Sequence, residues 1–275
     1  MIVHHPFAYR VGPLEITGFG VAVLLAFVIA QIISQRELAR RGYDPTPIGD
    51  LIFAAVIGGL LGAKLYYVVL TGDIHMLWSR AGFVFWGGLI GGTVAVLATA
   101  RVKRIPLMRV MDVGGIAVAA AYAIGRTGCW AVGDDYGRPW SSALAVQFPQ
   151  GAPPSTAGNL QVLFGIPVPP GTSPDTVLSV YPTQLMEVTL GIVMFLILWR
   201  LRKHVHAEGW LFGVYMILAG IERFLIEFLR AKDDRFIGGL TVAQLIALLV
   251  VVGGIVLIQA RRTVTERARG IYASA

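Results

Sequence analysis

The stretch FIGGLTVAQLIALLVVVGGIVLIQA, residues 236–260, contains no charged side chain and lies between Arg235 and Arg261. A helix needs about 20 consecutive, mainly apolar residues to cross the hydrocarbon core of a bilayer. Two other stretches, 16–35 and 81–100, are equally free of charge. Each of the three stretches therefore predicts a transmembrane helix.

Four further apolar stretches are interrupted by isolated charges, and they lie at 48–70, 111–133, 180–200 and 209–230. The seven stretches predict an all-α polytopic membrane protein with seven transmembrane helices in a single membrane domain, residues 1–275. No basic segment lies close to Met1, so we expect the first helix to be retained and not cleaved as a signal peptide. Residues 134–179, between the fourth and fifth helices, are rich in proline, glycine and serine and predict a small cap on the outer face.

The composition supports the same fold class. Hydrophobic residues make up 56% of the chain and charged residues only 14%, against about 25% charged in average soluble domains. Mean hydropathy is +0.69. These values exclude a disordered chain, a collagen-like chain and a nucleic-acid-binding domain, although the net charge of +7 alone would be compatible with nucleic acid. The single cysteine, Cys129, excludes an intramolecular disulfide.

The basic residues predict the orientation in the membrane, because loops rich in lysine and arginine remain on the cytoplasmic side. Alternate predicted loops, at 36–41, 101–109, 200–203 and 261–269, carry 14 of them. The opposite side carries six, namely Arg10, Arg80, Arg138, Arg230, Lys232 and Arg235. We therefore expect an outside N-terminus and a cytoplasmic C-terminus. The concentration of half of these six at 230–235 suggests a functional role.

Seven charged side chains lie within the predicted spans or at their edges, where an ionisable group costs at least ~2.5–3.5 kcal/mol at a helix centre. They are Lys64, Asp112, Arg126, Glu187, Glu222, Arg223 and Glu227. Such groups either form structural ion pairs that hold the helices together or line a polar cavity for a charged ligand. Both interpretations remain open from the residues alone.

Spacing adds detail to this set. Arg223, Glu227 and Arg230 share one helix face, and Arg126 lies between two glycines in the tetrapeptide 125–128. A second shared face, with spacings of three, contains Tyr181, Gln184 and Glu187. The planar guanidinium of arginine matches phosphate oxygens. Two or three arginines inside a helix bundle therefore suggest recognition of a phosphate in a lipid-accessible cavity.

Other motifs favour helix packing over chemistry. The run GGLIGG at 87–92 and the pair Gly58 and Gly62 have the spacing of small residues at helix–helix contacts in membranes. Cys129 lies at membrane depth and is interpreted as a small packing residue. His4 and His5 are interpreted as part of a solvated terminus. HExxH, CxxC and GxSxG are all absent from the sequence, and we predict neither a metal nor a cofactor.

Five motifs together resemble one family, the prolipoprotein diacylglyceryl transferases of bacteria. They occur in the family's order over nearly the whole chain, and Gln244 follows them in the last helix. The motifs are GGLIG at 87–91, GRTG at 125–128 with GDDYG at 133–137, YPTQLME at 181–187, and ERFLIEFLR at 222–230.

The resemblance implies an enzyme of the bacterial inner membrane whose site opens toward the outer face. Its members move a diacylglyceryl group from phosphatidylglycerol to the lipobox cysteine thiol in the signal peptide of a preprolipoprotein, and they release glycerol 1-phosphate. Catalytic residues carried over by position are Arg126, which would hold the phosphate, Arg223 near the reacting head group, Glu227, and Asp134 at a position where the family usually has Glu. Substrate-binding residues carried over in the same way are Trp86, Gly87, Gly88, Gly128, Gly137, Gln184, Glu187 and Arg230.

Some positions depart from the family pattern. Trp86 stands where His is frequent, Cys129 where Asn is usual, and Phe19, Met186 and Ala219 where Tyr is usual. These changes remove groups that could handle protons, whereas the arginines remain. Two alternatives therefore stay beside the main expectation: a related membrane lipid transferase with a different acceptor, and a non-catalytic protein that binds or transports anionic phospholipid. The residues leave the general base open between Glu227 and Asp134.

Overall fold

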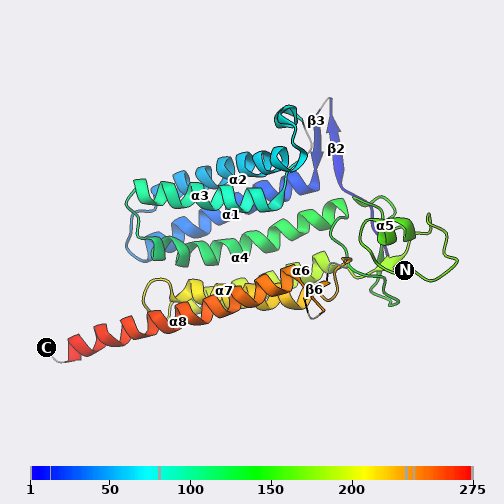
Figure 1. Ribbon diagram of the computed structural model, residues 1–275. Coiled ribbons are helices and arrows are strands. Elements are labelled where there is room, and N and C mark those ends of the chain that lie inside the picture. The colour runs from blue at the N-terminus through cyan, green and yellow to red at the C-terminus, as the bar shows by residue number, and fades with distance from the viewer. Residues whose placement is uncertain (1, 13, 80–81, 233–234, 238, 274–275) are drawn as a thin grey trace. The chain divides into compact units, whose positions relative to one another are not determined.

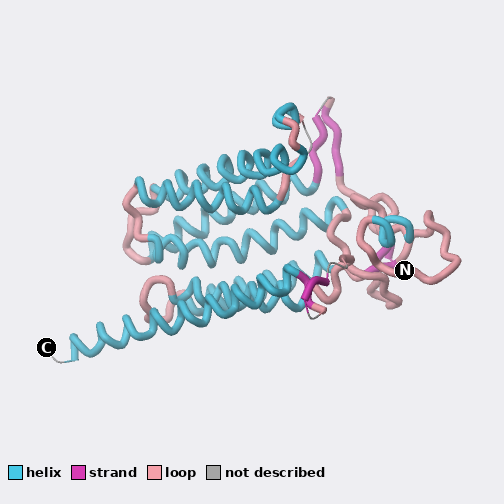
Figure 2. Tube along the Cα trace, viewed as in Figure 1, coloured by secondary structure: helices cyan, strands magenta, loops and turns pink. Residues whose placement is uncertain are grey.

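The computed structural model describes residues 2–12, 14–79, 82–232, 235–237 and 239–273. Arg80 and the side chains of Arg235, Arg267 and Arg269, which count among the basic residues that predict the orientation, lie outside the described residues. Seven long helices dominate the described chain (Figures 1 and 2). They are α1 (Gly18–Arg40), α2 (Pro47–Thr71), α3 (Phe85–Val102), α4 (Leu107–Val132), α6 (Thr183–Leu201), α7 (Trp210–Ile226) and α8 (Val242–Ala273).

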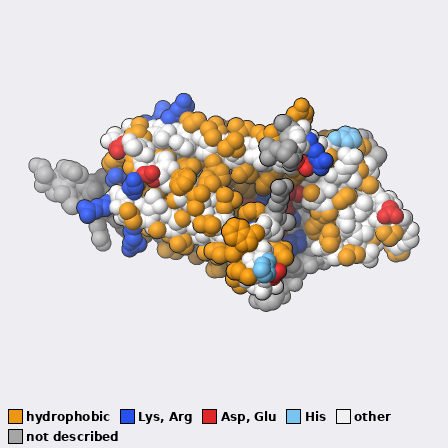
Figure 3. All heavy atoms as spheres, turned by 90° about the horizontal axis from the view of Figure 1, so that it is seen from above, with side chains coloured by type: hydrophobic (Ala, Val, Ile, Leu, Met, Phe, Trp, Pro, Cys, Tyr) orange, Lys and Arg blue, Asp and Glu red, His pale blue; other side chains and the backbone are white. Residues whose placement is uncertain are grey.

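The all-α polytopic prediction is confirmed. Within the described residues, six of the seven long helices are long and apolar enough to cross a membrane, and the remaining one, α7, has 17 residues. Many of their large apolar side chains are exposed, for example Phe53 at 69% and Leu249 at 71%. Hydrophobic side chains spread over the helices in Figure 3. Such a surface is stable against lipid tails, which are as apolar as leucine.

Two predicted helix starts, residues 16 and 236, fall within β-strands, and the helices begin two and six residues later. The chain forms a hairpin, β2 (Ala8–Val11) and β3 (Leu14–Thr17), before α1. The strands β6 (Arg235–Ile237) and β7 (Leu240–Thr241) pair antiparallel, and α8 starts only at Val242. Gly239, whose backbone φ is +79°, directly precedes β7. Apolar composition alone cannot separate a short strand from the first turn of a membrane helix.

A capping box explains where α8 begins. The Gln244 backbone N–H donates to Thr241 Oγ1 at 3.2 Å, and the Thr241 backbone N–H donates to Gln244 Oε1 at 3.0 Å. This reciprocal pair satisfies two backbone donors that an isolated helix start leaves unpaired. The Thr-x-x-Gln spacing in the sequence is the signal that could have located the start.

The helical chain divides into two compact units, residues 1–30 with 115–275 and residues 31–114. We call them the first and the second unit. In the second unit, α2 and α3 pack together, and a buried apolar cluster includes Leu38, Ile48, Leu51, Ala100 and Val113. The short 3-10 helix η1 (Ile74–Trp78) lies between α2 and α3 in the chain. The single-domain expectation stays a prediction.

Glycines bring α2 and α3 into backbone contact, as their spacing predicts. A Cβ on Gly62 would collide with the Gly87 carbonyl oxygen and lie 2.8 Å from the Gly91 Cα. A Cβ on Gly59 would lie 3.7 Å from the Gly88 carbonyl oxygen, an ordinary van der Waals distance. The two glycines are thus sterically different although they lie on the same helix.

This difference predicts that alanine at Gly62 and alanine at Gly59 have different effects on the free energy of unfolding. We expect Gly62→Ala to lower the free energy of unfolding by about 1–3 kcal/mol, because the added methyl forces two backbones apart. Gly59→Ala is the matched control and should change stability little or raise it slightly, since alanine favours helix over glycine. Thermal unfolding in detergent micelles measures both, and equal shifts for the two variants would contradict the packing argument.

The first unit contains the predicted cap. Residues between α4 and α6 form α5 (Ala157–Val162), β4 (Val146–Gln147) and β5 (Ser179–Val180), and β4 pairs with both β5 and β1 (Ile2–Val3). Its own core contains the buried residues Tyr136, Val146, Phe148, Leu160, Ile166, Val180 and Ala231. The cap is therefore a small folded element and not an extended loop.

One interpretation of the N-terminus is wrong. His4 is buried, and its ring centroid lies 4.8 Å from that of Trp130 and 5.0 Å from that of Phe148. The His4 backbone N–H donates to the Gln147 carbonyl at 2.9 Å. Pairing of β1 with the cap carries His4 into the core, whereas its neighbour His5 is exposed. A histidine can be buried in this way because its ring has a largely apolar body.

Candidate functional site

Charged side chains of the first unit gather at one end of three helices. This cluster, which we call the arginine–carboxylate cluster, joins the end of α4 and the loop after it, the start of α6, and the end of α7 with the loop that follows. It consists of three arginines and five carboxylates: Arg126, Arg223, Arg230, Asp134, Asp135, Glu187, Glu222 and Glu227. Five of the seven charges predicted at membrane depth meet here.

The other two belong to the second unit and have local partners. Lys64 donates to the Ser79 carbonyl at 2.7 Å and to its hydroxyl at 3.0 Å. Asp112 pairs with Arg41 at 3.5 Å. For Asp112 the structure bears out the interpretation as a structural ion pair, whereas Lys64 is held by hydrogen bonds to Ser79.

Arg126 is held between two carboxylates. Its Nη1 lies 2.7 Å from Asp135 Oδ2, and its Nη2 lies 3.0 Å from Glu187 Oε1. Tyr122, one helical turn earlier on α4, places its hydroxyl 3.2 Å from Glu187 Oε1 and 2.8 Å from Glu222 Oε1. A hydrogen bond whose donor or acceptor is ionised is about twice as strong as a bond between neutral groups. The contacts orient the Arg126 guanidinium before any ligand binds.

Arg230 approaches the same carboxylates from the segment after α7. Its Nη2 lies 2.7 Å from Asp135 Oδ1, and its Nη1 lies 3.8 Å from Glu187 Oε1. Both oxygens of Asp135 therefore bind guanidinium groups. The backbone at Asp135 has a φ of +56°, in the left-handed region that is uncommon for a side chain other than glycine. Sparsely populated backbone conformations of this kind concentrate at functional sites.

Glu227 forms the third part of the cluster. Its Oε2 accepts from Arg223 Nη2 at 2.5 Å, and its Oε1 accepts from the Thr241 hydroxyl at 3.0 Å. Arg230 Nε lies 3.8 Å from the same Oε2. The carboxylate is buried and fixed on both oxygens. Thr241, the residue directly before α8, thus contributes a contact that the sequence did not identify.

Backbone contacts connect the parts of the cluster. The Gly137 N–H donates to the Tyr181 carbonyl at 2.8 Å, and a Cβ on Gly137 would lie 2.5 Å from the Leu229 carbonyl oxygen. The Thr183 hydroxyl donates to the Asp135 carbonyl at 2.7 Å, and Gln184 Nε2 donates to the Asp134 carbonyl at 2.5 Å. The glycine at 137 is required because three chain segments meet there. Gln184 holds the loop that carries both aspartates.

The predicted glycines at 87, 88 and 128 have packing neighbours in the structure. A Cβ on Gly128 would lie 2.8 Å from the Ala22 Cβ and 3.2 Å from the Phe19 Cα, so α1 passes close to it. Gly87 and Gly88 face α2 within the second unit, next to Trp86. Their roles, and that of Trp86, stay predictions.

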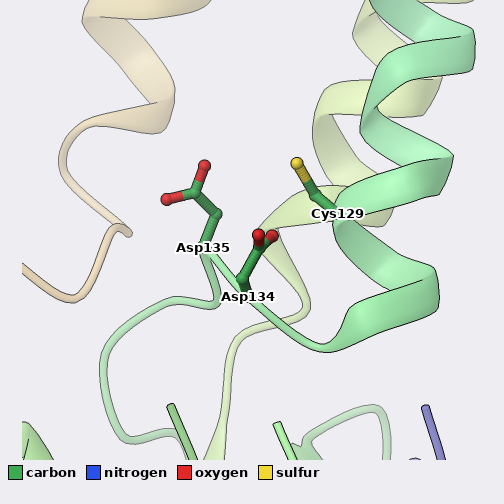
Figure 4. Close-up of side chains that lie close together, drawn as sticks. All are labelled: Cys129, Asp134 and Asp135. Atoms are coloured by element: carbon green, nitrogen blue, oxygen red, sulfur yellow. The ribbon is translucent and has the colours of Figure 1, made fainter. Parts of the chain in front are cut away.

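The loop after α4 brings Asp134 close to Cys129 (Figure 4). The Cys129 sulfur also lies 3.6 Å from Arg126 Nη1. Among the described residues, Cys129, Asp134 and Asp135 are also the one group of three metal-ligating side chains whose ligand atoms lie within 4.8 Å of one another. Because both Asp135 oxygens already bind guanidinium groups, we assign these side chains to hydrogen bonding and not to a metal.

The two neighbouring aspartates differ electrostatically. Burial raises the pKa of Asp134, and the charge of Asp135 raises it further, to about 6. Burial also acts to raise the pKa of Asp135, but the charges and hydrogen bonds of Arg230 and Arg126 outweigh it and lower that pKa to about 2. At neutral pH, Asp135 is therefore a permanent anion, whereas Asp134 can exchange a proton near physiological pH.

Several polar atoms of the cluster are buried without a hydrogen-bond partner among the described residues. They are Arg223 Nη1, Arg230 Nη1, Asp134 Oδ1, Gln184 Oε1 and Glu187 Oε2. A buried unsatisfied group costs about 1–3 kcal/mol, and native proteins tolerate few of them. Their concentration in one cluster is typical of a site that serves binding or catalysis and not stability alone.

The fold and this cluster define a polytopic membrane protein with a buried arginine–carboxylate site at one end of its helices. The family model described as prolipoprotein diacylglyceryl transferase matches residues 6–260. The chain belongs to this family, and the family resemblance found in the sequence motifs is confirmed.

Curated relatives agree with the family model. The chain is 31% identical over 283 residues to a phosphatidylglycerol–prolipoprotein diacylglyceryl transferase of Paraburkholderia phymatum, covering 92% of this chain and 91% of that protein. It is 27% identical over 259 residues to a protein of the same name from Clostridium tetani, covering 91% and 95%. The chain is 29% identical over 307 residues to the Paraburkholderia xenovorans protein of this name, and the match spans both chains completely.

Proposed function

We propose that this chain transfers the diacylglyceryl group of phosphatidylglycerol to the cysteine thiol of a prolipoprotein and releases glycerol 1-phosphate. The relatives are named for this transfer. The observation that carries the proposal is the set of three converging arginines, two of which have buried Nη1 atoms without hydrogen-bond partners. Guanidinium groups of this kind suit the phosphate of an anionic lipid.

The reaction is a substitution at carbon. The thiol sulfur forms a bond to a glyceryl carbon, the bond between that carbon and the phosphate oxygen breaks, and its electron pair stays on the departing phosphate. Negative charge therefore grows on an oxygen of the leaving group. Preorganised cations in a water-poor site stabilise such charge without reorganisation.

Roles for the side chains follow from their contacts. Arg126 binds the lipid phosphate, because Glu187 and Asp135 already fix its plane. Arg223 stabilises the departing oxygen. Glu227 orients the Arg223 guanidinium by accepting its hydrogen bond at 2.5 Å. Arg230 adds positive charge on the other side of Asp135. Gln184 positions the aspartate loop.

The cell location and the second substrate extend the proposal. We place the chain in the bacterial inner membrane with the cluster toward the outer face and the acceptor cysteine in a lipobox of a signal peptide. Support comes from the loops rich in lysine and arginine, which lie at the helix ends opposite the cluster in α4, α6 and α7. Basic loops remain cytoplasmic.

A reconstituted assay tests the transfer directly. The purified chain is placed in phosphatidylglycerol vesicles with a lipobox peptide, and the peptide mass is followed. We expect a gain of one diacylglyceryl unit, and no gain with a control peptide in which serine replaces the lipobox cysteine. Consumption of phosphatidylglycerol without a mass gain would indicate a different acceptor. Binding of the lipid without any turnover would indicate a non-catalytic protein, and either result would overturn the proposal.

A further inference from the structure

Asp134 differs from the other carboxylates of the arginine–carboxylate cluster. Asp135, Glu187 and Glu227 each pair with an arginine. Glu222 is buried and accepts a hydrogen bond from Tyr122. Asp134 has no guanidinium within salt-bridge distance among the described residues, and its Oδ1 accepts no hydrogen bond there. Among the described residues, Asp134 and Glu187 each have an oxygen without a hydrogen-bond partner, and of these two acids only Asp134 lacks an arginine partner.

Its surroundings already accommodate a sulfhydryl group. The Cys129 sulfur lies within 4.8 Å of one carboxylate oxygen of Asp134 and of one of Asp135, and Figure 4 shows the three side chains close together. Asp134 is also only partly buried as a residue, unlike Glu187 and Glu227, although its Oδ1 is itself covered. Gln184 holds its backbone in place at 2.5 Å. The geometry thus combines a fixed carboxylate, an oxygen without a partner and proximity to the arginines.

We propose that Asp134 accepts the proton of the acceptor thiol during the transfer, an assignment that rests on the proposed function. The S–H proton moves to the Asp134 carboxylate, and the sulfur electron pair forms the bond to the glyceryl carbon. The bond from that carbon to the phosphate oxygen breaks, and its electron pair leaves with glycerol 1-phosphate. Every atom and charge is accounted for by the two substrates and this side chain.

Glu227 is excluded as the acceptor by its own contacts. Both of its oxygens are occupied, one by Arg223 and one by Thr241, and a proton there would break the pair that orients Arg223. The charged and titratable groups that influence Asp134 are Asp135, Cys129, Arg126 and Arg230. They leave its pKa at about 6, so the carboxylate is mostly ionised at pH 7 and ready to accept a proton.

The test measures transfer to a lipobox peptide between pH 5 and 9 for the wild type, Asp134→Asn and Asp134→Glu. The wild-type kcat/KM should rise through about pH 6 and level off, because the unprotonated carboxylate is the active form. Asp134→Asn should lose about 100-fold or more at pH 7. Its remaining rate should rise tenfold per pH unit toward about pH 8.5, where the peptide thiol ionises by itself. KM for phosphatidylglycerol should stay unchanged.

Controls separate this role from a structural one. Asp175→Asn removes a carboxylate from the exposed surface of the same cap and should leave the rate and its pH profile intact. A loss in Asp134→Asn that is equal at every pH, or no loss at all, would overturn the assignment. Should that variant fail to fold, Asp134→Glu decides: it should keep most of the plateau rate and shift the acidic midpoint, and an unshifted midpoint overturns the proposal. A wild type that never modifies the peptide would instead refute the proposed function.

Discussion

Arg126→Ala is expected to lower the rate of diacylglyceryl transfer by at least about 10³-fold, because it removes the most preorganised cation of the site. Its two guanidinium contacts, with Asp135 at 2.7 Å and Glu187 at 3.0 Å, fix the side chain in one orientation. Arg126→Lys should recover little, since an ammonium group cannot replace a planar fork of donors. The rate of mass gain of a lipobox peptide in phosphatidylglycerol vesicles measures both variants.

Arg10→Ala is the matched control for Arg126→Ala. Arg10 also pairs with a carboxylate in the first unit, Glu15 at 3.4 Å, but both partners are exposed. Its removal should leave the transfer rate within about twofold, because exposed ion pairs are worth ~0–1 kcal/mol. Arg126→Ala protein must also retain a cooperative thermal transition. A folded variant with the wild-type rate would show that Arg126 does not hold the phosphate.

The sequence predicted the members of the site better than their contacts. Buried charges are so costly in a membrane that Arg126, Glu187, Arg223 and Glu227 stand out from an apolar background. Which arginine meets which acid depends on helix packing across long sequence separations. The pairing of Arg126 with Glu187 is an example, because no local spacing rule relates α4 to α6.

Residues that the sequence missed are ordinary in composition. Tyr122 looks like a packing residue on α4, yet its hydroxyl joins Glu187 and Glu222. Asp135 is adjacent to the predicted Asp134, and only its contacts with Arg126 and Arg230 show that the two side chains serve different partners. Thr241 was hidden inside an apparently continuous apolar stretch. Tertiary contacts, and not residue type, give these side chains their importance.

The ion pairs of the cluster have two possible explanations, structural pairs or a ligand site, and the geometry supports a combination. Glu187 is completely buried and contacts Arg126, Arg230 and Tyr122, so it stabilises the fold. Its Oε2 nevertheless has no hydrogen-bond partner among the described residues. A network built only for stability would satisfy each buried oxygen, because partly satisfied networks are costly. The same acid therefore holds the helices and keeps an arginine ready for its ligand.

Glu187→Ala is accordingly expected to lower the free energy of unfolding by about 3–5 kcal/mol, the cost of leaving a buried charge without its partner. Of its two carboxylates Arg126 would keep only Asp135, and Arg230 would lose one of its three, keeping Asp135 and Glu227. Thermal unfolding in detergent micelles measures the change. Glu15→Ala, which breaks the exposed pair with Arg10, is the control and should cost ~1 kcal/mol or less.

A double-mutant cycle with Arg126→Ala separates the pair from its surroundings. If the Arg126–Glu187 contact carries the effect, Glu187→Ala should cost much less in the Arg126→Ala background than in the wild type, because the buried guanidinium is already gone. Additive losses would mean that Glu187 acts mainly through Tyr122 and Arg230. Comparable losses for Glu187→Ala and Glu15→Ala would contradict the view that the cluster stabilises the helices at all, and would leave ligand binding as its only role.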